Sequence, residues 1–137
     1  ICTFMGCPPV YGAPLITLMA SFPSVVKRTQ KERVEEEFKK VNYVLERINH
    51  IKGFEILGKQ PKLHPLVNLN TPAFKEVAEN HSRRGFFLRE EFKERGIIGM
   101  LPGISTELKF NTYQLSWSQI KHFTSALLSI CDKYNIN

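Results

Sequence analysis

Residues 99–118 constrain the fold more than any other stretch, because they join the pattern of a strand to the start of a helix. After a Pro-Gly turn, apolar and polar residues alternate over residues 108–113, which is the period of a half-buried strand. Ser116 then stands three residues before Gln119, the spacing of a capping box, in which each side chain satisfies the backbone N–H of the other residue. The sequence therefore predicts a central strand that leads directly into a helix.

Two long helices are each expected to bury an apolar stripe. One is predicted over residues 24–51 and the other begins at Ser116, and in both the apolar residues recur at spacings of three and four. The first stripe consists of Val34, Phe38, Val41, Leu45 and Ile48, and the second of Trp117, Ile120, Phe123, Leu127, Ile130 and Tyr134.

The rest of the chain predicts shorter elements. Residues 15–19 form an apolar segment that is expected to be buried and to end at Pro23. Short strands are expected at residues 54–57, 66–70 and 97–98, and helices are expected to begin at Pro72 and Phe86. Because strands and helices intermix, the sequence predicts an α/β (α+β) domain, a small, mainly antiparallel sheet with helices packed on one face.

A chain of 137 residues has the usual size of one domain with one core. Residues 1–23 are apolar and rich in turns, so we expect them to continue from an upstream large domain and residues 24–137 to form a small domain. The net charge of +6 fits a polyanionic partner such as nucleic acid, and it also fits a merely soluble basic surface. The 3 dispersed cysteines favour a reducing, cytoplasmic compartment, and no run is apolar enough to span a membrane.

Few residues carry a chemical signal. Cys7 lies between Gly6 and Pro8, in a turn that can present its thiol, and a nearby cation would favour the reactive thiolate. Arg83 and Arg84 form either a solvated helix end or a phosphate clamp. The 4 histidines show no metal-ligand spacing, and the chain holds neither a Walker loop nor a dinucleotide fingerprint.

Three segments spread over nearly the whole chain carry a family resemblance: GCPPVYGAPLITLMASFPSVV, RRGFFLREEFKERGIIGMLPG and LKFNTYQLSWSQI. Together they resemble the C-terminal part of O-phosphoseryl-tRNA:cysteinyl-tRNA synthase. That family depends on pyridoxal 5′-phosphate, belongs to the cysteine-desulfurase-like fold-type I group and converts O-phosphoseryl-tRNA into cysteinyl-tRNA with a sulfur donor in methanogenic archaea. The resemblance implies that this chain is its small C-terminal domain, entered by a long helix.

The resemblance also implies roles for individual residues. The Schiff-base lysine and most cofactor contacts would lie upstream, so the fragment alone would be inactive. Cys7 matches a cysteine that carries sulfur as a persulfide in the family. Lys109 stands on the strand where related enzymes use an Arg to hold a free substrate carboxylate, a group that an aminoacyl-tRNA lacks.

The implied partners are tRNA carrying O-phosphoserine, a second copy in a homodimer, and phosphoseryl-tRNA synthetase with a bridging protein. Arg83, Arg84 and Lys109 are the candidate contacts to the tRNA-bound substrate, although Lys109 can equally be a solvent-facing strand residue. Two other interpretations stay open. One is the matching domain of a cysteine desulfurase-like enzyme for a free amino acid, against which Lys109 argues, and the other is a non-catalytic protein-interaction module.

Overall fold

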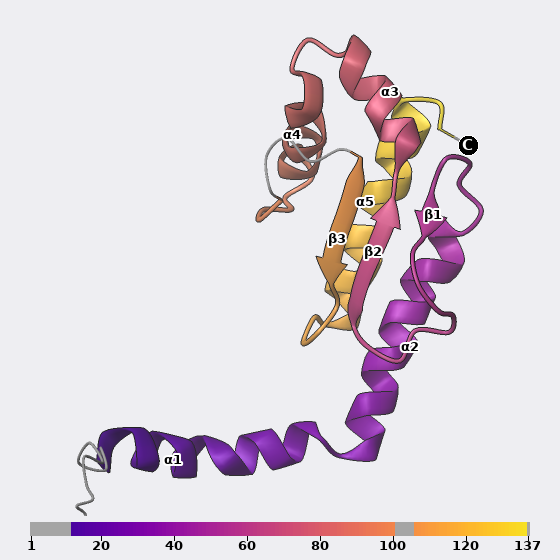
Figure 1. The fold of residues 1–137 in the computed structure, drawn as a ribbon. Helices are drawn as coiled ribbons and strands as arrows, with labels where there is room; N and C mark the ends of the chain where they lie inside the picture. Colours follow the sequence, from indigo (N-terminus) through magenta and orange to yellow (C-terminus); the bar gives the residue numbers. More distant parts are fainter. Residues whose placement is uncertain (1–11, 101–105, 137) are drawn as a thin grey trace, which may run out of the picture. The chain divides into compact units, whose positions relative to one another are not determined.

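The computed structural model describes residues 12–100 and 106–136 (Figure 1). The chain divides into two compact units, Ile1–Glu35 and Glu36–Asn137. None of the helices in the described ranges is long and apolar enough to cross a membrane. The elements follow in the order α1 (Gly12–Arg28), α2 (Lys31–Ile48), β1 (Glu55–Ile56), β2 (Leu66–Asn70), α3 (Pro72–Asn80), the 3₁₀ turn η1 (Arg84–Phe86), α4 (Phe87–Glu94), β3 (Glu107–Asn111) and α5 (Trp117–Lys133).

Helix α1 forms most of the described part of the first unit, and it exposes its apolar side chains. The sequence predicts that this apolar segment ends at Pro23, and this prediction is wrong, because the helix continues through Pro23. The side chains predicted to be buried are exposed in the present chain. Proline removes one hydrogen bond of the helix, and its ring crowds the carbonyl one turn earlier, but here the helix continues despite both effects. The large apolar residues that are 46–67% exposed are Leu15, Ile16, Leu18, Met19, Phe22, Val25 and Val26.

The single long helix predicted after this segment is also wrong, because the chain forms two helices that meet at Thr29. The backbone N–H of Thr29 bonds the carbonyls of Val25 and Val26 at 3.2 Å, and its hydroxyl donates to the carbonyl of Val26 at 2.9 Å. Threonine side chains compete with the helix ladder through such local hydrogen bonds. The next helix then starts with the carbonyl of Gln30, which accepts the N–H of Val34 at 3.1 Å.

The described strands form one antiparallel sheet in the order β1-β2-β3 (Figure 1). Leu69 of β2 pairs with Leu108 of β3. The neighbouring pair joins Asn68 of β2 to Lys109 of β3. Because side chains alternate across a strand, the leucines lie on the inner face and the polar pair on the outer face. The alternation predicted for residues 108–113 is confirmed, and so is the α+β class. The central position predicted for this strand is wrong, because β3 lies at an edge of the described sheet and β2 lies between β1 and β3.

The strand predicted at residues 97–98 does not form, because these residues follow the end of α4. The N–H of Ile97 bonds the carbonyl of Phe92 at 2.8 Å, and that of Gly96 bonds the carbonyl of Lys93 at 3.0 Å, which are the two bonds of a Schellman motif. Gly96 has φ = 75°, the left-handed conformation that this motif requires and that glycine adopts without steric cost. The N–H of Ile97 is thus used at the helix end rather than in a sheet.

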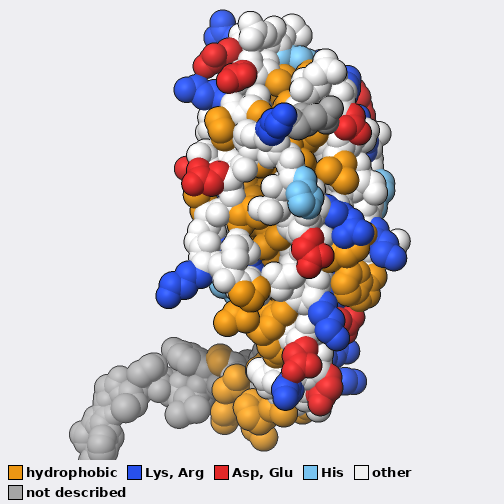
Figure 2. All heavy atoms as spheres, turned by 90° about the vertical axis from the view of Figure 1, so that its right-hand side faces the viewer, with side chains coloured by type: hydrophobic (Ala, Val, Ile, Leu, Met, Phe, Trp, Pro, Cys, Tyr) orange, Lys and Arg blue, Asp and Glu red, His pale blue; other side chains and the backbone are white. Residues whose placement is uncertain are grey.

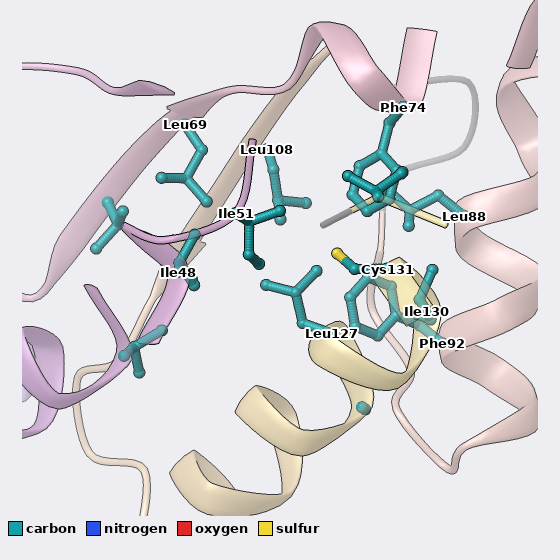
Figure 3. Packing of buried hydrophobic residues seen from close by; sticks show 14 of the residues in the cluster. Ile48, Ile51, Leu69, Phe74, Leu88, Phe92, Leu108, Leu127, Ile130 and Cys131 are labelled. Atoms are coloured by element: carbon teal, nitrogen blue, oxygen red, sulfur yellow. The ribbon is translucent and has the colours of Figure 1, made fainter. Parts of the chain in front are cut away.

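Helix α5 lies behind β2 and β3 in Figure 1 and closes the core. It begins with the predicted capping box, in which the Ser116 hydroxyl accepts from the Gln119 N–H at 3.2 Å and the Gln119 side chain accepts from the Ser116 N–H at 2.8 Å. Figure 3 shows Leu127 and Cys131 of α5 pointing toward the side chains of the sheet and of the other helices. Each large side chain buried in this way contributes roughly 1.5–3 kcal/mol.

A buried carboxylate, Glu91, ties α4 to the end of α5. Its side chain is 7% exposed, and it accepts hydrogen bonds from Arg95 at 2.7 Å, from the Tyr134 hydroxyl at 2.8 Å and from Lys133. Burial acts to raise the pKa of Glu91, but the hydrogen bonds from Lys133, Arg95 and Tyr134 outweigh it and lower the pKa below its ordinary value. Burial, together with the hydrogen bond to Glu91, raises the pKa of Tyr134 to about 12.

Replacing Glu91→Gln is expected to lower the free energy of unfolding by about 1–3 kcal/mol at pH 7, because hydrogen bonds to a charged group are lost. The pKa of Glu91 is lower in the folded protein than in the unfolded chain, so its contribution is present above the ordinary carboxyl pKa and is lost as the pH falls through the folded value. Urea denaturation of both proteins from pH 7 to pH 3 measures this. Glu94→Gln, at an exposed position of the same helix, is the matched control. A stability difference that does not shrink at low pH would contradict the assignment.

Candidate functional site

Lys109 lies in the middle of β3 on the outer face of the sheet. Its side chain is 63% exposed, and its ammonium group lies 3.3 Å from a carboxylate oxygen of Glu107. Exposed ion pairs of this kind contribute only about 0–1 kcal/mol, so Lys109 can exchange this partner for another anion at little cost. The structure thus places the side chain where the alternation predicts, and a role in substrate binding stays a prediction.

The outer face around Lys109 carries further polar groups that sequence reasoning did not single out. Asn68 is its cross-strand partner, and the side-chain oxygen of Asn68 is buried and accepts no hydrogen bond from the described residues. Asn70 pairs with Glu55, and its amide donates to the Glu55 carboxylate at 3.3 Å. The signal that could have found them is the alternation of Leu-Val-Asn-Leu-Asn along β2. This face can therefore offer both donors and acceptors to a polar ligand.

Arg83 and Arg84 lie in the turn between α3 and α4, and both are exposed. Arg84 has φ = 47°, an uncommon conformation for a residue with a side chain. Its N–H bonds the carbonyl of His81 at 2.8 Å, and the N–H of Arg83 bonds the ring nitrogen of His81 at 3.1 Å. The Arg83 guanidinium lies 4.0 Å from the carboxylate of Glu90. The described contacts do not bring these arginines together with Lys109.

Phe86, at the end of this turn, is 53% exposed, whereas the adjacent Phe87 is 1% exposed. The sequence predicts only that both residues belong to the second short helix. Sequence pattern alone does not distinguish two adjacent phenylalanines, so the exposed ring beside Arg83 and Arg84 was missed.

Two further potential nucleophiles or metal ligands of the described part, Cys131 and His122, have structural surroundings. Cys131 is buried, and burial together with the charge of Asp132 raises the pKa of its thiol to about 12, so the thiolate does not form near neutral pH. A ring nitrogen of His122 lies 2.8 Å from the carbonyl of Arg95. No cluster of three His, Cys, Asp or Glu side chains that could hold a metal ion occurs among the residues described. Cys7 lies outside these residues.

The described residues do not fit pyridoxal 5′-phosphate. A Schiff-base lysine needs an uncharged amine in a shielded pocket, and the two buried lysines are otherwise engaged. Lys40 lies 2.8 Å from the carboxylate of Glu37, and the Lys62 ammonium group donates to the carbonyl of Leu57. All the other lysines in residues 12–100 and 106–136 are exposed.

No protein-family model matches the chain. Curated relatives do match it over nearly its whole length. It is 45% identical over 96% of its length to O-phospho-L-seryl-tRNA:Cys-tRNA synthase 2 of Archaeoglobus fulgidus and 44% identical, again over 96%, to the synthase of Methanopyrus kandleri. The synthase of Methanocaldococcus jannaschii is 42% identical over 93% of the chain. The chain spans about one third of these relatives, 33% of the length of each.

The fold agrees with the sequence comparison. A crystal structure of the SepCysS-SepCysE N-terminal domain complex contains a chain that matches with a TM-score of 0.79 and 42% identity. The match covers 88% of the present chain and 32% of that chain. The resemblance carried by the three sequence segments is confirmed, and the chain is a homologue of the O-phospho-L-seryl-tRNA:Cys-tRNA synthases over about one third of their length.

Proposed function

We propose that the chain is the C-terminal part of a cytoplasmic enzyme that converts O-phosphoseryl-tRNA into cysteinyl-tRNA. The observation that carries this proposal is the 38–45% identity to synthases of that name over 93–98% of the chain. In the reaction, the phosphate group leaves the β-carbon of the serine and a carbon–sulfur bond replaces it. The substrate is polyanionic, which fits the net charge of +6.

The rest of the full-length enzyme would hold pyridoxal 5′-phosphate, since the described residues do not fit it. When bound, this cofactor supplies the electron sink for elimination chemistry at an amino acid. The part of the protein that holds it would also cover α1, whose large apolar side chains are 46–67% exposed. A contiguous apolar surface of this kind marks an interaction site.

Cys7 is the proposed sulfur carrier. As a persulfide, its terminal sulfur would form the bond to the β-carbon, and a thiol reductant would then supply the two electrons that cleave the remaining S–S bond. The raised pKa of Cys131 favours Cys7 over Cys131 as the carrier, because it leaves the Cys131 thiol protonated.

A protein partner is also proposed. The similar chain of known structure was crystallised in a SepCysS-SepCysE N-terminal domain complex, which supports the proposal that an equivalent partner binds the full-length protein. A homodimer and an association with phosphoseryl-tRNA synthetase stay predictions from the family resemblance.

Cys7→Ser in the full-length enzyme is expected to reduce cysteinyl-tRNA formation to background, because a hydroxyl group cannot carry a persulfide. Acid-gel analysis of the charged tRNA, with sulfide withheld and a protein-bound sulfur donor supplied, measures the product. The matched control is Cys131→Ala, which removes a buried thiol and is expected to retain product formation. Wild-type product from the Cys7 variant would exclude this residue as the carrier.

Lys109→Ala is expected to lower kcat/KM for tRNA-linked turnover roughly ten- to a hundredfold, the effect of losing one charge-assisted hydrogen bond. The melting temperature should hardly change, because the side chain is 63% exposed and fills no core volume. Lys121→Ala, an exposed lysine of α5, is the control for loss of one positive charge. If both variants turn over at the same rate, Lys109 is only a surface residue.

The 137-residue chain alone is expected not to retain pyridoxal 5′-phosphate, because its described lysines are either ion-paired, hydrogen-bonded or exposed. The cofactor is added in excess, the protein is dialysed, and the visible spectrum is recorded. A Schiff-base band that survives dialysis would show that a lysine of this chain holds the cofactor.

A further inference from the structure

We propose that the turn between α3 and α4 and the exposed face of α4 bind an unpaired segment of RNA, with a base stacked on Phe86. The inference rests on the proposed function, which makes an RNA-linked amino acid the substrate. It goes further, because it assigns the recognition of the RNA itself to a surface built from Phe86, Arg84, Arg89 and Lys93.

The backbone sets the geometry of this surface. Phe86 has φ = −83° and ψ = −10°, so helical geometry already holds one residue before α4 begins. Residues three and seven positions apart share a helix face, which places Phe86, Arg89 and Lys93 in one exposed row. The opposite face of α4 is buried in the core, and its residues are Phe87, Leu88, Glu91 and Phe92.

The charge of the surface is positive. Four cations, Arg83, Arg84, Arg89 and Lys93, are exposed there, and the surface also carries two carboxylates, those of Glu90 and Glu94. Glu90 is half-buried and paired with Arg83. Within residues 12–100 and 106–136, the side chains of Arg84, Arg89 and Lys93 form no ion pair, so these cations are available to phosphate groups. In contrast, the face of the molecule in Figure 2 intermixes Lys and Arg with Asp and Glu, without a region of one sign.

The turn is held in place from the core side. A ring nitrogen of His81 accepts a hydrogen bond from the N–H of Arg83, and the His81 carbonyl accepts one from the N–H of Arg84. The centroid of the His81 ring lies 5.5 Å from that of Phe87 and 6.1 Å from that of Tyr134. A turn fixed in this way keeps Arg84 at φ = 47° and presents Phe86 before any ligand binds. Preorganisation lowers the entropic cost of binding, and an uncommon backbone conformation is a feature of ligand-binding turns.

RNA fits this surface better than a protein partner does. A single exposed ring surrounded by charged side chains offers little apolar area to a protein interface. An unpaired base needs only one aromatic face, and cations beside the ring can bind the flanking phosphates. A duplex keeps its bases stacked on one another, so the ring selects a single-stranded segment.

The test measures binding of a fluorescein-labelled single-stranded RNA to the 137-residue chain by fluorescence anisotropy at several salt concentrations. The RNA has about ten nucleotides, which is within the range of site sizes of single-strand-binding surfaces. Phe86→Leu, which keeps an apolar side chain but removes the ring, is expected to weaken binding about 5- to 150-fold. Phe86→Trp is expected to retain affinity, and RNA is expected to quench the fluorescence of the new indole. Arg89→Ala and Lys93→Ala should each weaken binding and lower the salt slope by about 0.7.

Lys59→Ala, in the loop after β1 and away from α4 in Figure 1, is the matched control for loss of charge and should leave both affinity and slope unchanged. Circular dichroism checks that each variant is folded. No binding by the wild-type chain, or equal affinity of wild type and Phe86→Leu, would overturn the proposal. The proposal would also be overturned if Phe86→Leu kept its RNA affinity but lost self-association in sedimentation. That result would identify Phe86 as a protein-contact residue.

The outcome is independent of the proposed enzymatic activity. If the chain binds RNA through Phe86 but the full-length enzyme makes no cysteinyl-tRNA, the surface stands and the proposed function fails. If the enzyme makes cysteinyl-tRNA and Phe86→Leu leaves RNA affinity unchanged, only the surface is wrong.

Discussion

The pairing of β2 with β3 is the constraint on which the rest of the second unit depends. Side chains alternate across the pair, so one register turns Leu69 and Leu108 toward α5 and leaves Asn68 and Lys109 on the outer face. A slip of one strand by one residue would move its polar side chains to the core face and its apolar ones to the outer face. Apolar burial therefore fixes the register, and the register in turn decides which polar groups the sheet can offer to a ligand.

This part of the fold could be predicted because its signals are local. Alternation over residues 108–113 and the spacing of Ser116 and Gln119 are properties of short segments, and both are confirmed. The helix break at Thr29 and the absent strand at Ile97 could not be predicted in the same way. In each case a local hydrogen bond ends the element: the Thr29 hydroxyl donates to the carbonyl of Val26, and the Ile97 N–H donates to the carbonyl of Phe92. The apolar pattern of the sequence does not show these bonds.

The residues of the candidate site also differ in whether a local sequence pattern can locate them. The exposure of Lys109 follows from strand alternation, so the sequence locates it correctly on the sheet. The exposure of Phe86 follows from the 3₁₀ turn, which decides that Phe87 rather than its neighbour enters the core. The conformation of Arg84 depends on His81, whose position is set by ring contacts that are distant in sequence. Local pattern carries no information about such contacts.

Tyr134 connects the core to this turn in two ways. Its hydroxyl donates to the buried carboxylate of Glu91, and its ring contacts both Phe87 and His81. Tyr134 therefore belongs both to the hydrogen-bond network that joins α4 to α5 and to the ring contacts that hold His81 beside the turn. A movement of the turn that displaced His81 would disturb the buried hydrogen bonds of Glu91. Under the proposed function, this link would hold the proposed RNA-binding turn at a fixed position in the second unit while the amino acid on the RNA reacts elsewhere in the enzyme.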